Sequence, residues 1–175
     1  SLALRLWGHS GARTGLLLLG LVVVFAVAGP WLIGTDPNQS DFALSRSAAG
    51  GPPGPSWAHP LGSDSLFRDV LARLAAGARL SLLIAACATI IATCLGATVG
   101  MVSGYFGDRW PDRILTGVVD IALAFPFLLL ITAIGVAMAQ TDAVTVTLVL
   151  GLTGWPGVAR VVRAKTRAVT ACGYV

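Results

Sequence analysis

Long apolar runs separated by short polar segments dominate the pattern of this chain. Residues 80–107 carry no charge over 28 positions, which exceeds the about 20 helical residues that cross the hydrocarbon core of a bilayer. Residues 14–33, 114–138 and 143–159 meet or approach that length. A backbone in lipid must satisfy its own hydrogen bonds, and these runs lack the alternation typical of barrel strands. The pattern therefore predicts an all-α membrane protein with four transmembrane helices.

Residues 35–79 form the long polar segment between the first two runs. The stretch AAGGPPGPSWAHP at 48–60 is rich in Gly and Pro, which predicts an irregular surface loop. The stretch SDSLFRDVLARLAAGARL at 63–80 places apolar residues on one helical face and charged residues mostly on the other. With capping candidates at 63–65, it predicts an amphipathic helix on the outer membrane surface that continues into the second span.

Positive charge is distributed unevenly around the predicted spans. The chain has a net charge of +4 and only 11% charged residues, against about 25% in soluble domains. Eight Lys and Arg lie in the N-terminal tail, before the third span and after the fourth, whereas the segment 35–79 balances four Arg with four Asp. Because Lys and Arg accumulate in cytoplasmic loops, the N-terminus is predicted to be cytoplasmic. Basic clusters beside apolar runs also argue against a nucleic-acid partner.

Three glycines spaced by four residues lie in the second span. Gly96, Gly100 and Gly104 form a smooth stripe that allows another helix to approach closely. The approaching helix belongs either to the same subunit or to a second subunit, and the sequence leaves both possibilities open.

An acid and two prolines interrupt the later spans. Asp120 lies inside the third span, where an ionisable residue needs a partner or a water-filled path. Arg113 lies seven residues earlier on the same face. We therefore expect a structural pairing of Asp120 with an Arg or with the backbone, and direct contact with a bound substrate is the alternative. Pro126 and Pro156 remove backbone donors and are predicted to kink the third and fourth spans.

No arrangement of residues in the sequence indicates catalysis or metal binding. His59 stands in a loop without a second His or an acidic cluster at ligand spacing, which favours a structural role. The sequence contains no G-x-x-x-x-G-K-[ST] phosphate-binding loop and no Ser/His/Asp or Cys/His set. We therefore expect neither enzymatic activity nor a cofactor or metal on this chain.

Three ordered motifs resemble the C-type permease subunit of the dipeptide/oligopeptide family of ABC importers, a family that also includes nickel and glutathione permeases. The first, HPLGSDSLFRDVLARLAAGARLSL at 59–82, is similar to the pattern H-P-L-G-T-D-x-x-G-R-D-V. Ser63 and Phe67 stand where that pattern has Thr and Gly. The outer-loop signature residues that match are His59, Pro60, Gly62, Asp64, Arg68 and Asp69.

The other two motifs lie in and after the third span. GYFGDRWPDRILTGVVDIALAFPFLLL at 104–130 resembles a pattern that begins G-Y-F-G-G, and Asp108 stands at its last Gly. GWPGVARVVRAKTRAV at 154–169 resembles W-x-x-Y-A-R-x-V-R. The matching residues are Asp112, Asp120, Ala124, Phe125, Pro126, Leu128, Trp155, Ala159, Arg160, Val162 and Arg163.

The resemblance implies a type I ABC importer permease fold with six spans, four of which are seen here. It implies three parts: the N-terminal tail and first span (1–34), an extracytoplasmic loop with the amphipathic helix (35–79), and the incomplete N-terminal part of the transmembrane domain (80–175). It also implies a bacterial plasma membrane location. The implied partners are a B-type permease subunit, one or two cytoplasmic ATPases that bind ATP and Mg, an extracytoplasmic solute-binding protein and membrane lipid.

The implied function is import of dipeptides, oligopeptides or similar small solutes. The alternatives are a nickel or glutathione permease of the same family, an ion-coupled carrier or channel, and a membrane scaffold. Arg160 and Arg163 lie on the cytoplasmic coupling side, where the basic run to Arg167 either sets topology only or extends the fourth helix toward an ATPase. The chain stops where the family's E-A-A coupling loop would begin, so a longer protein or a truncated gene is expected. Candidates for a pathway or for packing are Asp120, Phe125, Pro126, Trp155 and Pro156.

Overall fold

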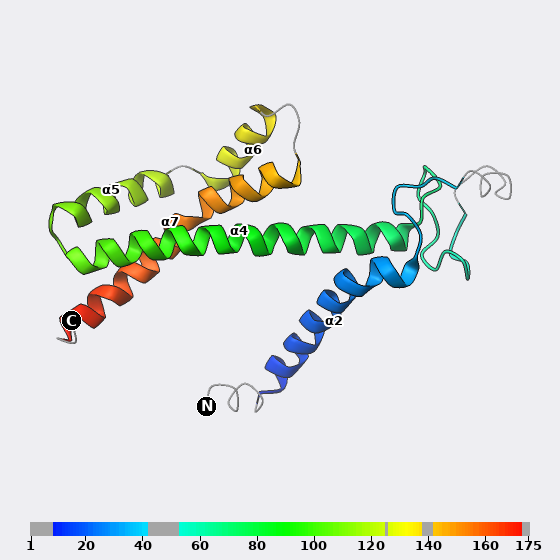
Figure 1. Ribbon diagram of the computed structural model, residues 1–175, viewed down its shortest axis with the longest axis horizontal. Coiled ribbons are helices and arrows are strands. Elements are labelled where there is room, and N and C mark those ends of the chain that lie inside the picture. Colours follow the sequence, from blue (N-terminus) through cyan, green and yellow to red (C-terminus); the bar gives the residue numbers. More distant parts are fainter. Residues whose placement is uncertain (1–8, 42–52, 125, 138–141, 173–175) are drawn as a thin grey trace. The chain divides into compact units, whose positions relative to one another are not determined.

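The computed structural model describes residues 9–41, 53–124, 126–137 and 142–172. Over these ranges the chain consists of helices joined by turns, with one isolated β-bridge between Ser63 and Asp69. The expectation of an all-α protein is therefore confirmed. Figure 1 shows the helices in chain order: α2 (Ser10–Ile33), α4 (Val70–Phe106), α5 (Trp110–Ala124), α6 (Phe127–Ala137) and α7 (Ala143–Ala171).

Three of the described helices are long and apolar enough to cross a membrane, namely α2, α4 and α7. They correspond to the first, second and fourth predicted spans. α4 has 37 residues and α7 has 29, both more than the about 20 that a bilayer core requires. α7 also continues beyond the predicted end of the fourth span, through Arg167 to Ala171. The basic run is therefore part of the same continuous helix.

The third predicted span is two helices rather than one kinked helix. α5 ends at Ala124, α6 begins at Phe127, and Pro126 lies between them. Pro lacks a backbone N–H and its ring clashes with the preceding turn, so it interrupts the helix here. Phe125 lies outside the described residues. Pro156, in contrast, does not interrupt its helix, because α7 continues through it.

The chain separates into two compact units, residues 1–82 and 83–175, and the division falls within α4. In the first unit, α2 packs on the first turns of α4. A Cβ added at Gly29 would lie 3.0 Å from the Cβ of Ala75, and Ala26 and Ala72 are also buried at this contact. Small side chains therefore let these two helices meet closely. The expected division of the chain at residues 34 and 79 stays a prediction.

The prediction that an amphipathic helix begins at residues 63–65 is wrong, because the helix begins at Val70. The residues before α4 form turns, and α4 begins one residue after Asp69. Phe67 has a φ of 55°, which a right-handed helix cannot include. Asp69 caps the helix, because its Oδ1 accepts hydrogen bonds from the backbone N–H groups of Leu71 at 2.8 Å and Ala72 at 3.1 Å. The charged residues after Asp69 therefore belong to the first turns of the long helix α4.

In the second unit the glycine stripe of α4 faces α7, and the two helices cross (Figure 1). A Cβ added at Gly100 would lie 2.6 Å from the carbonyl oxygen of Ala159 and 2.8 Å from the Cβ of Val162. Added Cβ atoms at Gly96 and Gly104 would lie 2.7 and 2.8 Å from carbonyl oxygens of α7. The backbones therefore touch at all three glycines. Of the two partners left open by the sequence, the stripe contacts a helix of the same chain.

We expect Gly100→Ala to destabilise the protein, because its Cβ would push the backbone of α7 away. The expected loss is about 1–3 kcal/mol, as for other overpacked sites. Gly77→Ala is the matched control in the same helix, because nothing lies within 4 Å of its added Cβ and Ala favours a helix over Gly by about 1 kcal/mol. Thermal unfolding in detergent, followed by helical circular dichroism, measures both. A midpoint for Gly100→Ala at or above that of Gly77→Ala would contradict the contact.

Candidate functional site

The signature around His59 folds into a loop held against the start of α4. His59 Nδ1 lies 2.9 Å from Oδ2 of Asp69, which is only 5% exposed. The backbone N–H of His59 donates to Oγ of Ser56 at 3.1 Å, and its carbonyl accepts from the N–H of Gly62 at 2.9 Å. Pro60 lies exposed in the turn that this last bond closes. His59 thus makes a structural contact, and no group of three or more metal-ligating side chains occurs among the described residues.

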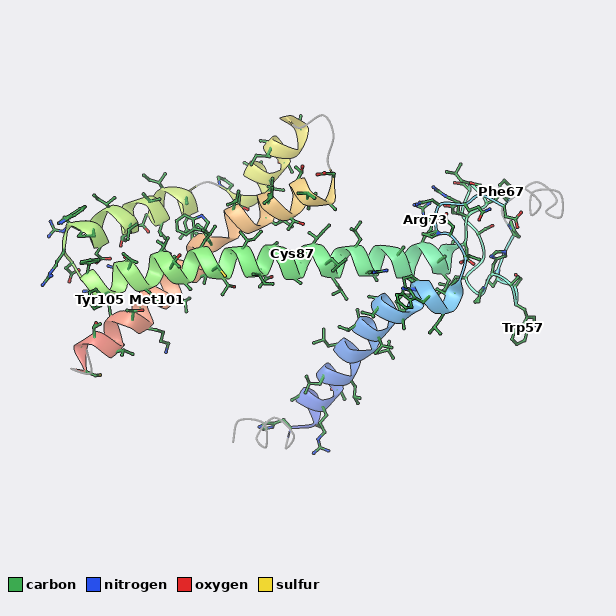
Figure 2. The ribbon with its side chains drawn as sticks, in the orientation of Figure 1. Trp57, Phe67, Arg73, Cys87, Met101 and Tyr105 are labelled. Atoms are coloured by element: carbon green, nitrogen blue, oxygen red, sulfur yellow. The ribbon has the colours of Figure 1, made fainter. Side chains whose placement is uncertain are left out.

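Asp64 is the second anchor of this loop, and Figure 2 labels its ion-pair partner Arg73. Its Oδ1 accepts hydrogen bonds from the backbone N–H groups of Leu66 at 2.8 Å and Arg68 at 3.0 Å. Its Oδ2 accepts from Nε of Arg68 at 2.9 Å and from the guanidinium of Arg73 at 2.7 Å. One carboxylate therefore closes the turn and ties it to the first helical turn of α4.

Hydrogen bonding lowers the pKa of both carboxyl groups in the loop. The backbone N–H of Arg68 holds the pKa of Asp64 well below its usual range; desolvation opposes this effect, and the Arg68 guanidinium adds to it. Desolvation alone would raise the pKa of Asp69, but hydrogen bonds from His59 and the backbone N–H of Ala72 outweigh it and lower the pKa. Both groups thus stabilise the fold above the pKa of an unfolded Asp, about 3.9, and that contribution is lost as the pH falls toward their lowered values.

Two residues with left-handed backbone stand where the resembled family pattern has Gly. Phe67 and Asp108 both have a φ of 55°. Asp tolerates this conformation because its short polar side chain can form local hydrogen bonds, whereas Phe has no such compensation. The Phe67 backbone is held on both sides: its N–H donates to the carbonyl of Asp64 and its carbonyl accepts from the N–H of Asp41, each at 2.9 Å. The loop therefore imposes a strained conformation on Phe67.

A second cluster lies where the ends of α4 and α7 meet the start of α5. Asp112, in the first turn of α5, is 1% exposed. Arg163 of α7 donates from Nε to Oδ1 at 2.6 Å and from Nη2 to Oδ2 at 2.7 Å, a bidentate pair. Oγ of Ser103 and Oγ1 of Thr116 donate to Oδ1 at 2.5 and 3.2 Å, and the backbone N–H of Asp108 donates to Oδ2 at 2.9 Å. These five residues, here the Asp112 cluster, join three helices through one carboxylate.

Two further ion pairs, both more exposed than the Asp112–Arg163 pair, flank the Asp112 cluster. Nη2 of Arg160 lies 2.8 Å from Oδ1 of Asp120, and both side chains are more than half exposed, at 62% and 57%. Nη2 of Arg167 lies 2.6 Å from Oδ2 of Asp108. A pair exposed to water contributes about 0–1 kcal/mol and a polar tie between membrane helices averages about 0.6 kcal/mol, whereas removing one partner of a buried pair costs more because a buried charge is left unpaired. The buried Asp112 carboxylate therefore dominates the contact of α7 with α4 and α5.

Asp120 forms a structural Asp–Arg pair as expected, but its partner is Arg160 and not Arg113. Seven helical residues separate Asp120 from Arg113 by about 10 Å along the axis, so sharing a face does not bring them into contact. The Asp112 cluster was not predicted, although Asp112 and Arg163 both lie in recognised motifs. The sequence did contain a clue to this cluster. Charged residues beside apolar spans need partners, and the three Asp within 108–120 equal in number the three Arg within 160–167.

Trp155 and Pro156 lie where α7 crosses the glycine stripe. The carbonyl oxygen of Trp155 would lie 2.7 Å from a Cβ added at Gly96, and Pro156 is buried. Both residues therefore contribute to helix packing, and a part for them in a solute pathway stays a prediction.

Comparison with known proteins relates the chain to permeases. Residues 2–50 match the family model described as the N-terminal TM domain of oligopeptide transport permease C. A Brucella ovis protein whose name assigns it provisionally to the peptide permeases is 33% identical over 165 residues, covering 92% of this chain and 51% of its own length. The glutathione transport system permease protein of Pectobacterium atrosepticum is 35% identical over 168 residues, covering 95% and 53%.

A third relative is the oligopeptide transport system permease protein of Haemophilus influenzae. It is 27% identical over 162 residues, covering 93% of this chain and 50% of its own length. The chain therefore spans about half the length of the curated relatives that it matches.

We expect Phe67→Gly to stabilise the loop relative to Phe67→Ala. Both substitutions remove the ring, but only Gly adopts a positive φ without a steric cost, which predicts a difference of about 1 kcal/mol. Hydrogen exchange of the backbone amides in 62–72, measured by mass spectrometry, reports this local stability. Equal or lower protection in the Gly variant would show that the backbone at residue 67 is not left-handed.

We expect Asp112→Ala to destabilise the second unit by about 2–3 kcal/mol, because it leaves the part-buried Arg163 guanidinium, the Ser103 hydroxyl and the backbone N–H of Asp108 without their acceptor. Asp120→Ala is the matched control on the same helix and should cost less, about 0.6 kcal/mol, the average for a polar tie between membrane helices. Thermal unfolding in detergent measures both variants. Adding Arg163→Met to Asp112→Ala should recover part of the loss. Equal effects of the two Asp variants would contradict the dominance of the buried pair.

Proposed function

We propose that this chain, which is similar over most of its length to permeases of oligopeptide transporters, is a membrane-spanning subunit of an ATP-driven importer of short peptides or similar small solutes. The observation that carries the proposal is the similarity to permeases over nearly the whole chain. Three helices capable of crossing a membrane agree with it. The proposed location is the bacterial plasma membrane, with the N-terminus in the cytoplasm.

The proposed partners supply what this chain would lack in such a complex. A B-type permease subunit would complete the pathway, an extracytoplasmic binding protein would deliver the solute, and one or two cytoplasmic ATPases would bind ATP and Mg. The sequence has no phosphate-binding loop of its own, which supports the placement of ATP hydrolysis on separate subunits.

α7 is the element suited to transmit movement from an ATPase into the membrane. It is continuous from Ala143 to Ala171 and includes the basic run of Arg160, Arg163 and Arg167. A continuous helix carries displacement along its length, provided that it has discrete packing arrangements with its neighbours. The Asp112 cluster ties α7 to α4 and α5, so a push on the end of α7 would move this junction and the crossing at Pro156 together.

An ion-coupled carrier would use an ionisable group that can bind and release a cation within the membrane. In the parts of segments 108–120 and 160–167 that the structure describes, Asp108, Asp112 and Asp120 each pair with an Arg. This pairing favours the ATP-driven proposal. The similarity to a glutathione permease supports glutathione, itself a short peptide, as a second candidate solute.

The test of this function is co-expression of the complete protein that the gene encodes with a candidate permease partner and ATPase encoded beside it. Purification through a tag on this chain should recover both partners. Vesicles containing the complex and binding protein should take up a radiolabelled tripeptide when ATP is supplied to the ATPase side, and a proton ionophore should not stop uptake. Absence of both partners after purification would contradict the proposal, as would uptake that follows an ion gradient and ignores ATP.

We expect residue 54 to face the outside of the cell and residue 109 to face the cytoplasm. On a background without Cys87, Cys94 and Cys172, Gly54→Cys should react with a membrane-impermeant maleimide in intact cells, and Arg109→Cys should react only after permeabilisation. Both positions are exposed in the structure, and nothing lies within 4 Å of a Cβ added at Gly54. The opposite labelling pattern would reverse the proposed orientation.

A further inference from the structure

An open apolar groove, which the proposed function does not use, runs along the surface between the ends of α4 and α7. Its volume is about 750 Å³, within the range of small-molecule sites. Met101 and Val102 of α4 and Val162 and Val169 of α7 line its length. Figure 2 labels Met101 and Tyr105 on the last turns of α4, beside this groove. A groove of this composition suits a hydrocarbon chain.

A polar hollow of about 500 Å³ adjoins the apolar groove. Tyr105 and Phe106 line both spaces, with their rings packed edge to face at 5.6 Å between centroids. The charged residues that line the hollow are Arg109, Arg167 and Asp108, and Asp108 pairs with Arg167. The apolar groove therefore adjoins a polar hollow that carries one more positive than negative charge, and Tyr105 and Phe106 line both.

The cations around these two spaces differ in whether an acid of the chain neutralises them. Arg163 and Arg167 pair with Asp112 and Asp108. Lys165 lines the apolar groove and Arg109 lines the hollow, and neither forms an ion pair within the part of the chain that the structure describes. One uncompensated cation, Lys165, thus lies on the apolar groove and another, Arg109, on the adjoining polar hollow.

We propose that this composite surface, here the α4–α7 groove, binds an anionic phospholipid. An acyl chain would occupy the groove lined by Met101 and Val162, and the phosphate-containing headgroup would contact Lys165 and Arg109. Basic pockets between membrane helices on the cytoplasmic side recognise anionic headgroups in this way. The inference rests on the proposed function in one respect, because that function places these helix ends at the cytoplasmic leaflet.

The charge pattern favours an anionic lipid over a neutral one. A zwitterionic headgroup would fill the same groove but would leave the two cations without net compensation. Each Lys or Arg near the surface adds about 1 kcal/mol of attraction to anionic lipid, which is about fivefold in affinity. We therefore expect selectivity to depend on Lys165 and Arg109 and affinity for any lipid to depend on the apolar lining.

The test is native mass spectrometry of the 175-residue protein purified in detergent and supplied with equal amounts of phosphatidylglycerol and phosphatidylcholine of the same acyl chains. We expect preferential retention of phosphatidylglycerol. Lys165→Gln and Arg109→Gln should each weaken its retention about fivefold, and Lys165→Arg should retain it. Val169→Trp, which fills the groove and leaves every charge in place, should weaken retention of both lipids.

Arg113→Gln is the matched control, because Arg113 is a cation of the same region that lines neither space. It should leave retention unchanged, and helical circular dichroism should confirm that each variant folds. Equal retention of the two lipids would overturn the proposal, as would unchanged retention in Lys165→Gln and Arg109→Gln, or an equal loss in Arg113→Gln. The measurement needs no ATPase, binding protein or solute, so a failure of transport leaves its outcome unaffected.

Discussion

A single buried carboxylate, Asp112, holds the second unit of this protein together. A buried charge is stable only when opposite charge and hydrogen-bond donors surround it. Here Arg163, Ser103, Thr116 and the backbone N–H of Asp108 supply them. These donors come from α4, the following turn, α5 and α7. Satisfying one side chain therefore sets the positions of three helix ends relative to one another.

The Asp112 cluster can form only because α4 and α7 approach so closely. Their backbones touch at Gly96, Gly100 and Gly104, where any larger side chain would hold them apart. The glycine contact is a close approach of two backbones and sets the distance between the helices, whereas the carboxylate–guanidinium pair is directional and sets their register. Distance and register together fix how α7 packs on the part of α4 that lies in the second unit.

The loop before α4 depends on the same chemistry in an aqueous setting. Asp64 and Asp69 bind backbone N–H groups and cations within a few residues of themselves. The loop forces a left-handed backbone on Phe67, at a position where the family pattern has Gly. At position 108 the pattern also has Gly and this chain has Asp, whose side chain suits a left-handed backbone and also pairs with Arg167. The two departures from the pattern thus differ in their physical consequences.

The sequence by itself determined the elements whose causes are local. Apolar length predicted the spans that became α2, α4 and α7, and the spacing of Gly96, Gly100 and Gly104 predicted a close helix contact. Pro126 predicted a kink, where the structure has the end of one helix and the start of another. Tertiary structure alone decided which groups meet. Asp120 found Arg160 and not Arg113, Asp112 found Arg163 across 51 residues, and Asp69 rather than a residue at 63–65 became the cap of α4. The spacing of glycines and the length of an apolar run are properties of neighbouring residues. An ion pair between helices depends on how the two helices cross, which the sequence of either helix alone does not specify.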